Sequence, residues 1–92
     1  MYDTRYLLAI DPGKTSGVAL WDITEGFDPL LIETDEYNQF QTCTWAELWC
    51  ASGAHIEIVM ERYTIGDADS AWSLEIIGTV KYFAQKHGCS FT

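Results

Sequence analysis

Two acidic residues follow directly on apolar segments of the chain and are the residues most able to do chemistry together. Asp11 ends the run LLAI at residues 7–10, and Glu61 ends the run IEIVM at residues 56–60. A carboxylate at the end of a buried strand needs water, hydrogen bonds or a cation, because an unpaired buried charge is strongly unfavourable. Mg²⁺ prefers such hard oxygen ligands. We therefore interpret Asp11 and Glu61 together as candidate catalytic residues and ligands of Mg²⁺ or Mn²⁺.

The residues around each acid leave other interpretations open. Asp-Pro-Gly is also typical of a turn that the Asp side chain itself caps. Residues 13–16, GKTS, can alternatively offer backbone NH groups and hydroxyls to a nucleotide phosphate. Glu61 taken alone suits a solvated glutamate or a pair with Arg62. The combination of the two acids favours the metal site.

The elements that must position these acids can be predicted from the apolar pattern. Residues 7–11 and 17–21 predict two strands joined at Pro12 and Gly13, and residues 30–32 predict a third. Short connections between them favour an antiparallel meander. The polar segment 35–44 fits no element clearly.

A helix is predicted within residues 38–52, with a capping box from Thr44 to Glu47 and an end near Gly53. Trp45, Leu48 and Trp49 would lie on one side of it. Such a crossover allows residues 56–61 to form a fourth strand parallel to the first. Both acids would then stand at the carboxyl ends of neighbouring strands, where open sheets bind ligands.

The strongest helix pattern covers residues 70–87, with Asp69 or Ser70 as a cap and Gly88 as a stop. Leu74 lies off its apolar face. This face is broad enough to meet a second copy of the chain as well as the sheet. The apolar face consists of Trp72, Ile76, Ile77, Val80, Phe83 and Ala84.

Composition bounds the class of protein. With 92 residues, 48% of them hydrophobic, the chain is expected to form at most one small domain with a core. It has no apolar run of about 20 residues and no signal-peptide pattern, so we expect a soluble, intracellular protein without a membrane partner. Three cysteines without paired spacing indicate reduced thiols. The net charge of −9 by itself argues against nucleic-acid binding and is compatible with carboxylates that bind divalent cations.

Three motifs occur in an order that resembles a known family. These are AIDPGKTSGVALWD at residues 9–22, the acid of VMERY at residues 59–63, and DADSAWSL at residues 67–74. Together they resemble the RuvC-type Holliday-junction resolvases of the RNase H-like superfamily. The resemblance implies an α/β fold with a mixed sheet, in which strands 1–3 are antiparallel, strand 4 is parallel to strand 1, and helices flank the sheet.

The same resemblance implies a function. Asp11 and Glu61 match the family's metal-binding Asp and Glu. The enzymes of this family use Mg²⁺ or Mn²⁺ to hydrolyse phosphodiesters of four-way DNA junctions. Tyr63 lies near the family's junction-inserted aromatic residue. Helix 70–87 would form a homodimer, and the location would be the cytoplasm of a bacterium or a phage-infected cell. The candidate nucleic-acid contacts are Lys14, Arg62, Tyr63 and Lys81.

The chain also departs from the family. The remaining metal ligands of these enzymes lie on a later helix, and residues 90–92 fall where a fifth strand begins. We therefore expect residues 1–92 to be one incomplete domain, an N-terminal portion truncated before or within strand 5, with an open edge at strand 4 and no activity on its own.

Other functions fit parts of the same pattern. One is a non-catalytic dimerisation or DNA-scaffold module of this fold. Another is a nucleotide-binding fragment related to actin and the sugar kinases, and a YqgF-type RNA nuclease would share the Asp-Pro-Gly turn.

Overall fold

The computed structural model describes the backbone of residues 4–60 and 70–92 and the side chains of residues 4–60 and 73–92. Five strands and two helices form in this part of the chain. In order they are β1 (Arg5–Asp11), β2 (Thr15–Asp22), β3 (Leu30–Asn38), α1 (Gln39–Cys50), β4 (His55–Met60), α2 (Ser70–His87) and β5 (Ser90–Phe91).

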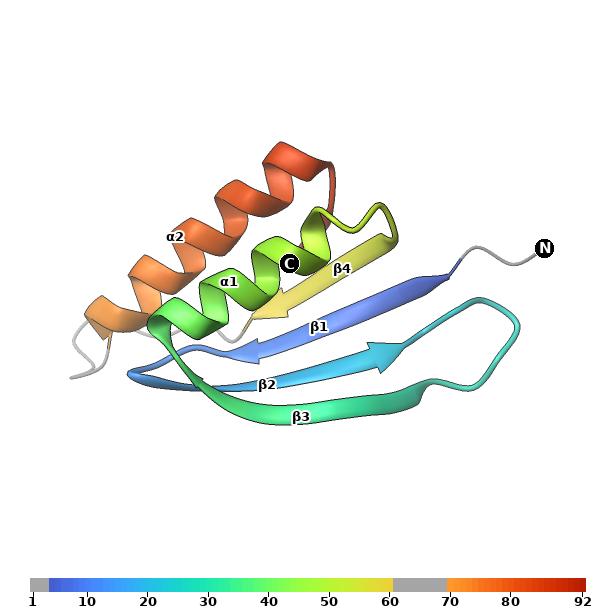
Figure 1. Cartoon of the computed structure of the whole chain (residues 1–92), viewed down its shortest axis with the longest axis horizontal. Helices are drawn as coiled ribbons and strands as arrows, with labels where there is room; N and C mark the ends of the chain where they lie inside the picture. The colour runs from blue at the N-terminus through green and yellow to red at the C-terminus, as the bar shows by residue number, and fades with distance from the viewer. Residues whose placement is uncertain (1–3, 61–69) are drawn as a thin grey trace.

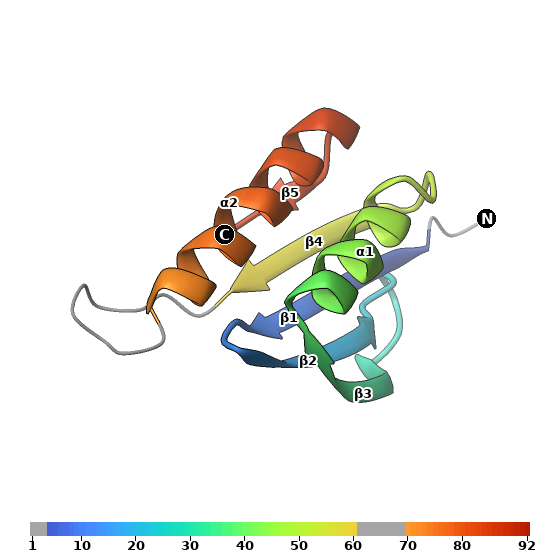
Figure 2. The same cartoon turned by 60° about the vertical axis from the view of Figure 1, so that its left-hand side comes forward.

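The strands form one mixed sheet in the order β3-β2-β1-β4-β5 (Figures 1 and 2). β1 pairs antiparallel with β2, β2 pairs antiparallel with β3, and β4 lies parallel to β1. This arrangement confirms the predicted meander and the predicted parallel fourth strand. α1 makes the crossover that brings β4 beside β1, as a parallel pair requires.

β3 is longer than its apolar residues predicted. It continues from Leu30 through the polar residues to Asn38, with Tyr37 opposite Ser16 and Asp35 opposite Val18. β3 is an edge strand and nearly all of it is exposed. Backbone pairing with β2 is therefore enough to hold polar residues in the strand, and no apolar alternation marks it in the sequence.

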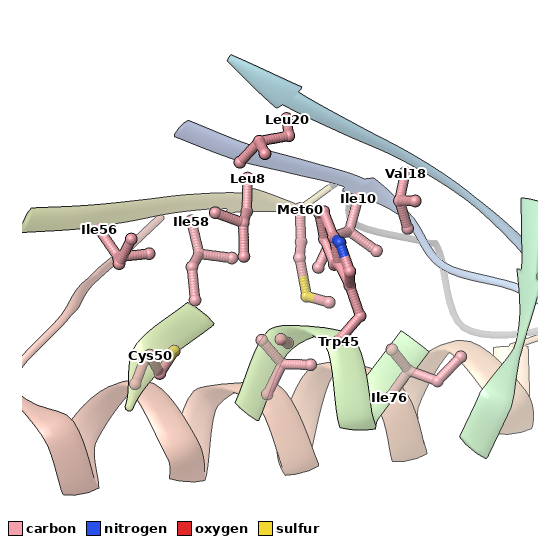
Figure 3. Close-up of a cluster of buried hydrophobic side chains, with 13 residues drawn as sticks. Leu8, Ile10, Val18, Leu20, Trp45, Cys50, Ile56, Ile58, Met60 and Ile76 are labelled. Carbon is pink, nitrogen blue, oxygen red and sulfur yellow. The ribbon is translucent and has the colours of Figure 1, made fainter. Parts of the chain in front are cut away.

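Both helices lie on the same side of the sheet (Figures 1 and 2). Every second strand residue points toward them, because successive side chains of a strand face opposite sides. Figure 3 shows these side chains meeting Trp45, Cys50 and Ile76 of the helices. The strand residues of this core are Leu8, Ile10, Val18, Leu20, Ile56, Ile58 and Met60.

The predicted range of α1 is confirmed, but the predicted capping box at Thr44 is wrong. Its N-cap is Asn38, whose Oδ1 accepts a hydrogen bond from Gln41 N at 2.8 Å, while Gln41 Oε1 accepts one from Asn38 N at 3.0 Å. The reciprocal pair satisfies two backbone donors at the end of β3, so the helix starts before the predicted box. Thr44 lies inside the helix, and Leu48 is exposed instead of sharing a buried face with Trp45.

The predicted bounds of α2 are confirmed. Ile76, Val80 and Ala84 are fully buried at helical spacing, and Leu74 is exposed off this face as expected. Gly88, with φ +72°, ends the helix in the left-handed conformation that glycine adopts without strain. Neither of the two described helices is long and apolar enough to cross a membrane.

The predicted open edge of β4 is corrected by β5. Ser90 and Phe91 pair in parallel with Glu57 and Ile58. Thr92 N donates to Ile58 O at 2.8 Å, and Thr92 O accepts from Met60 N at 3.2 Å. A short fifth strand therefore covers part of this edge and satisfies backbone groups that an open strand would leave to solvent.

The three cysteines are reduced, as predicted. Cys50 is buried at the end of α1, and Cys89 Sγ lies 3.7 Å from the carbonyl oxygen of Cys50. Burial, and to a smaller extent the hydrogen bond with Cys89, raise the pKa of the Cys50 thiol to about 12. The thiols are therefore part of the core between helix and sheet.

Candidate active site

Asp11 is the last residue of β1 and its side chain is exposed. In the parallel pair, Ile10 stands opposite Met60, the last residue of β4. The predicted alignment of the two strand ends is thus confirmed. Glu61 follows Met60 in the sequence, but Glu61, Arg62 and Tyr63 lie outside the described residues, so their part in the site stays a prediction.

The side chain of Asp11 belongs to the face of the sheet opposite the helices, because its neighbour Ile10 points into the core. A shallow hollow of about 830 Å³ lies at this end of the sheet. In the described part of the chain, both helices lie on the other side (Figure 2). The hollow is lined by residues from β1 to β4 that include Asp11, Gly17, Thr34, Glu36 and Val59.

Two further acids, Asp35 and Glu36, line the hollow, and no residue pattern singles out either of them. Asp11 pairs with Gly17, and Gly17 pairs with Glu36, so the three residues form one row across three strands. A Cβ placed on Gly17 would lie 3.9 Å from Asp11 Cβ, as expected for residues on the same face. Only the register of β3, which the sequence left open, brings Glu36 into this row.

The turn after Asp11 is held by buried groups. Pro12 and Ser16 are fully buried. Ser16 Oγ accepts a hydrogen bond from Gly13 N at 3.3 Å and donates one to Gly13 O at 3.4 Å. The Gly13 NH and the Ser16 hydroxyl are hydrogen-bonded within the turn, which argues against the interpretation of residues 13–16 as a phosphate-binding turn.

A second serine reaches the turn from α2. Ser73 Oγ donates a hydrogen bond to Pro12 O at 2.9 Å, and both groups are buried. The two residues are 61 positions apart in the sequence. No sequence pattern marks this contact, because the other buried side chains described on α2, those of Ile76, Val80 and Ala84, are apolar.

The remaining candidate residues are spread over a wider region. Lys14 is exposed in the turn itself, near Asp11. Lys81 is exposed on α2, eight residues beyond Ser73 and therefore about 12 Å further along the helix axis. Glu75 accepts a hydrogen bond from Gln39 Nε2 at 2.8 Å and so contacts α1. The structure thus brings Lys14, but not Lys81, to the end of β1.

The donor set at this end of the sheet suits a hard divalent cation, because it consists of carboxylate oxygens. Within residues 4–60 and 73–92, no group of three or more His, Cys, Asp or Glu side chains is placed to hold a metal ion. Asp11 is therefore the described ligand candidate, with Glu36 in the same row.

Comparisons with known proteins agree with the fold and leave the family open. No protein-family model matches the chain, and no curated protein matches it significantly. Among solved structures, Thermus thermophilus RuvC superimposes with a TM-score of 0.63 at 14% identity over 94% of this chain and 61% of that one. T. thermophilus RuvC in complex with a Holliday junction substrate gives 0.62 at 13% identity over 95% and 62%. The chain spans about three fifths of these proteins and has the RNase H-like fold that they share.

Proposed function

We propose that this chain is part of a metal-dependent nuclease that cleaves branched DNA, with four-way junctions as its substrate class. Asp11 and Glu61 would be its catalytic carboxylates and would hold Mg²⁺ or Mn²⁺ together. One observation carries the proposal. β1 and β4 are parallel neighbours in register, so that Ile10 and Met60 are paired and each is followed by an acid in the sequence.

Two further findings support the proposal. The fold resembles that of RuvC, and one RuvC structure contains a Holliday junction. Among the described residues, the hollow beside Asp11 is open on the face that the helices leave uncovered, which is compatible with a large substrate. Nucleotide binding is supported less well, because Gly13 and Ser16 bond to each other across the turn.

The residues of this chain would divide the work in a simple way. A bound divalent ion would supply Lewis-acid stabilisation of the phosphodiester and a more acidic water. Asp11 would fix the ion at the end of β1, where its backbone pairs with Gly17 of β2. Lys14 would contact a phosphate oxygen of the DNA backbone, and Arg62, Tyr63 and Lys81 would contribute to binding the junction. With two carboxylates as ligands, we expect the 92-residue chain to bind the ion weakly and not to cleave efficiently.

The metal site is tested by calorimetric titration of Mn²⁺ into the wild-type chain, Asp11→Asn, Glu61→Gln and the double variant. If both carboxylates hold one ion, each single change weakens binding and the double change adds little more, because the shared site is already lost. Mg²⁺ should also raise the unfolding midpoint of the wild-type chain, since it binds the folded state. Additive losses from two independent sites would contradict the proposal.

The substrate class is tested by fluorescence anisotropy with a four-way junction and a linear duplex of the same base composition, in the presence of Mg²⁺. We expect tighter binding of the junction. Gel analysis of the same mixtures reports cleavage. Equal affinity for both DNAs would argue against a junction enzyme, and efficient cleavage that Asp11→Asn abolishes would show that the site is more complete than we propose.

Self-association through α2 is a further part of the proposal. Leu74 and Tyr82 are 57% and 59% exposed and stand eight residues apart, so they lie on one side of the helix with Gly78 between them. A second copy would cover these apolar side chains. Light scattering should detect a dimer in the wild-type chain and a monomer for Leu74→Glu at an unchanged unfolding midpoint. Val80→Asp should instead lower the midpoint, because Val80 is in the core. A monomeric wild-type chain at high concentration would exclude this interface.

A further inference from the structure

We propose that Ser73 is a positioning residue for Asp11 and acts through the carbonyl group of Pro12. The inference rests on the proposed role of Asp11 as a metal ligand. Ser73 is 0% exposed, and its hydroxyl donates to Pro12 O at 2.9 Å. This bond joins the first turns of α2 to the residue that directly follows the candidate ligand.

The position of this hydrogen bond allows it to restrain the backbone of Asp11. Proline restricts the residue before it to extended backbone, so the conformation of Asp11 depends on where Pro12 is held. On its other side, Asp11 is paired with Gly17 in the sheet. Proline has no backbone NH, so the carbonyl oxygen that Ser73 binds is the only hydrogen-bonding group of Pro12. The backbone is thus fixed on both sides of the carboxylate.

The two serines at the turn have different roles. Ser16 bonds to Gly13 within the hairpin and shapes the turn locally. Ser73 belongs to the helix layer, so its bond determines where the end of the hairpin stands relative to α2. The Ser73 hydroxyl is fully buried, which is unfavourable without an acceptor, and Pro12 O supplies one.

The test uses Mn²⁺ affinity, measured by calorimetry on the 92-residue chain. Ser73→Ala removes the donor, and Ser73→Cys keeps nearly the same volume with a weaker donor. Thr42→Ala is the matched control, because Thr42 is also 0% exposed and its hydroxyl donates to a backbone oxygen, Asn38 O, at 2.8 Å. Thr42 lies in α1, and its described hydrogen bond is not to the turn. Removal of the Thr42 hydroxyl therefore reports general destabilisation.

We expect Mn²⁺ affinity to fall about tenfold in Ser73→Ala, as for other residues that orient a metal ligand, and less in Ser73→Cys. Thr42→Ala should keep wild-type affinity at a similar loss of stability. Wild-type affinity in Ser73→Ala, or an equal loss in Thr42→Ala, would overturn the inference. If Ser73→Ala does not fold, the comparison between Ser73→Cys and Thr42→Ala decides it in the same way.

A second readout without metal separates this inference from the proposed function. Hydrogen exchange of the Gly13 amide, measured by NMR, should become faster in Ser73→Ala and stay unchanged in Thr42→Ala, because the turn loses its anchor to α2 only in the first. Unchanged exchange in both variants would overturn the inference whatever the metal result. Equal Mn²⁺ binding by the wild-type chain and Asp11→Asn would instead overturn the proposed function, and the Gly13 amide would still report whether Ser73 positions the turn.

Discussion

Asp11 and Asp22 both end a strand of the same hairpin, yet the structure gives them different surroundings. Asp22 Oδ1 accepts hydrogen bonds from Thr24 N at 2.9 Å and Thr24 Oγ1 at 2.6 Å. The aspartate itself therefore closes the turn that follows it. These bonds from the Thr24 hydroxyl and then its backbone NH lower the pKa of the Asp22 carboxyl below its ordinary value.

The turn after Asp11 is instead closed by serine hydroxyls. Ser16 bonds to Gly13, and Ser73 reaches Pro12 from α2. Asp11 is exposed beside a hollow that it shares with Glu36. The comparison shows that a turn after a strand-end aspartate can be closed by the carboxylate itself, as at Asp22, or held by serine hydroxyls of two different elements, as after Asp11.

The largest expected effect concerns metal binding. Asp11→Asn should weaken Mn²⁺ binding about 100-fold. Removal of a residue that only orients a ligand costs about 10- to 100-fold in metal affinity, and loss of the ligand itself should cost at least as much. Asp22→Asn should leave binding unchanged. Tyr6, which pairs with Asp22, is five residues from Asp11, so the two acids are about 17 Å apart, beyond the screening length at physiological salt. Calorimetry on both variants checks this, and an equal effect of the two changes would remove the distinction between the acids.

The next effect concerns stability. Ser73→Ala should lower the free energy of unfolding by about 2 kcal/mol, because it leaves the buried oxygen of Pro12 without its donor. Ser90→Ala, a change at an exposed serine, should cost less than about 0.5 kcal/mol. Urea denaturation followed by Trp fluorescence measures both. A loss in Ser73→Ala no larger than in Ser90→Ala would mean that the turn after Asp11 does not depend on α2.

A smaller effect is expected at Glu36. Glu36 is two strand spacings, or about 10 Å, from Asp11. In a water-like dielectric, the negative charge of Glu36 would therefore stabilise a divalent ion at Asp11 by about 0.8 kcal/mol. Glu36→Gln should therefore weaken Mn²⁺ binding about fourfold at low salt, and less at high salt. Titration at two salt concentrations checks this. A salt-independent loss of more than about tenfold would identify Glu36 as a direct ligand, which would strengthen the contrast with Asp22.

The smallest effect tests the structural role of Asp22. Thr24→Ala removes the hydroxyl donor, so the pKa of the Asp22 carboxyl should rise toward its ordinary value, as measured by NMR titration of the carboxyl carbon. Because the folded pKa lies below the unfolded one, the carboxylate stabilises the fold fully above the ordinary pKa, and this contribution is lost as the pH falls through the folded value. In Thr24→Ala that acid-dependent loss should shrink. An unchanged titration would mean that the hydroxyl bond has no effect on the carboxyl group.

Much of the fold could be predicted from the sequence because its signals are local. The apolar segments before Asp11 and Glu61 marked two strands, and the 3.6-residue pattern with Gly88 as a stop marked α2. The range of α1 was predicted correctly, but its capping box was misplaced because two such boxes compete. Asn38 with Gln41 prevails at the end of β3, whereas Thr44 lies within the helix.

The candidate site divides in the same way. Asp11 could be singled out because an acid beside a buried apolar run is unusual on its own. Glu36 could not, since it lies in an exposed polar segment and reaches the row of Asp11 and Gly17 only through the register of β3. That register depends on backbone pairing with β2, which leaves no trace in residue types along an edge strand.

The sequence by itself determined the order of the main elements and the acids at two strand ends, because strand and helix periodicities, Gly turns and strand-end charges act over a few neighbouring residues. Only tertiary structure decided that Ser73 anchors Pro12, because this contact joins residues 61 positions apart. The bonds between Asp22 and Thr24 are local, whereas the turn after Asp11 is held in part by a helix that is distant in the sequence. Buried hydrogen bonds of this kind are selected by the whole packing arrangement and are not encoded in any short stretch of the chain.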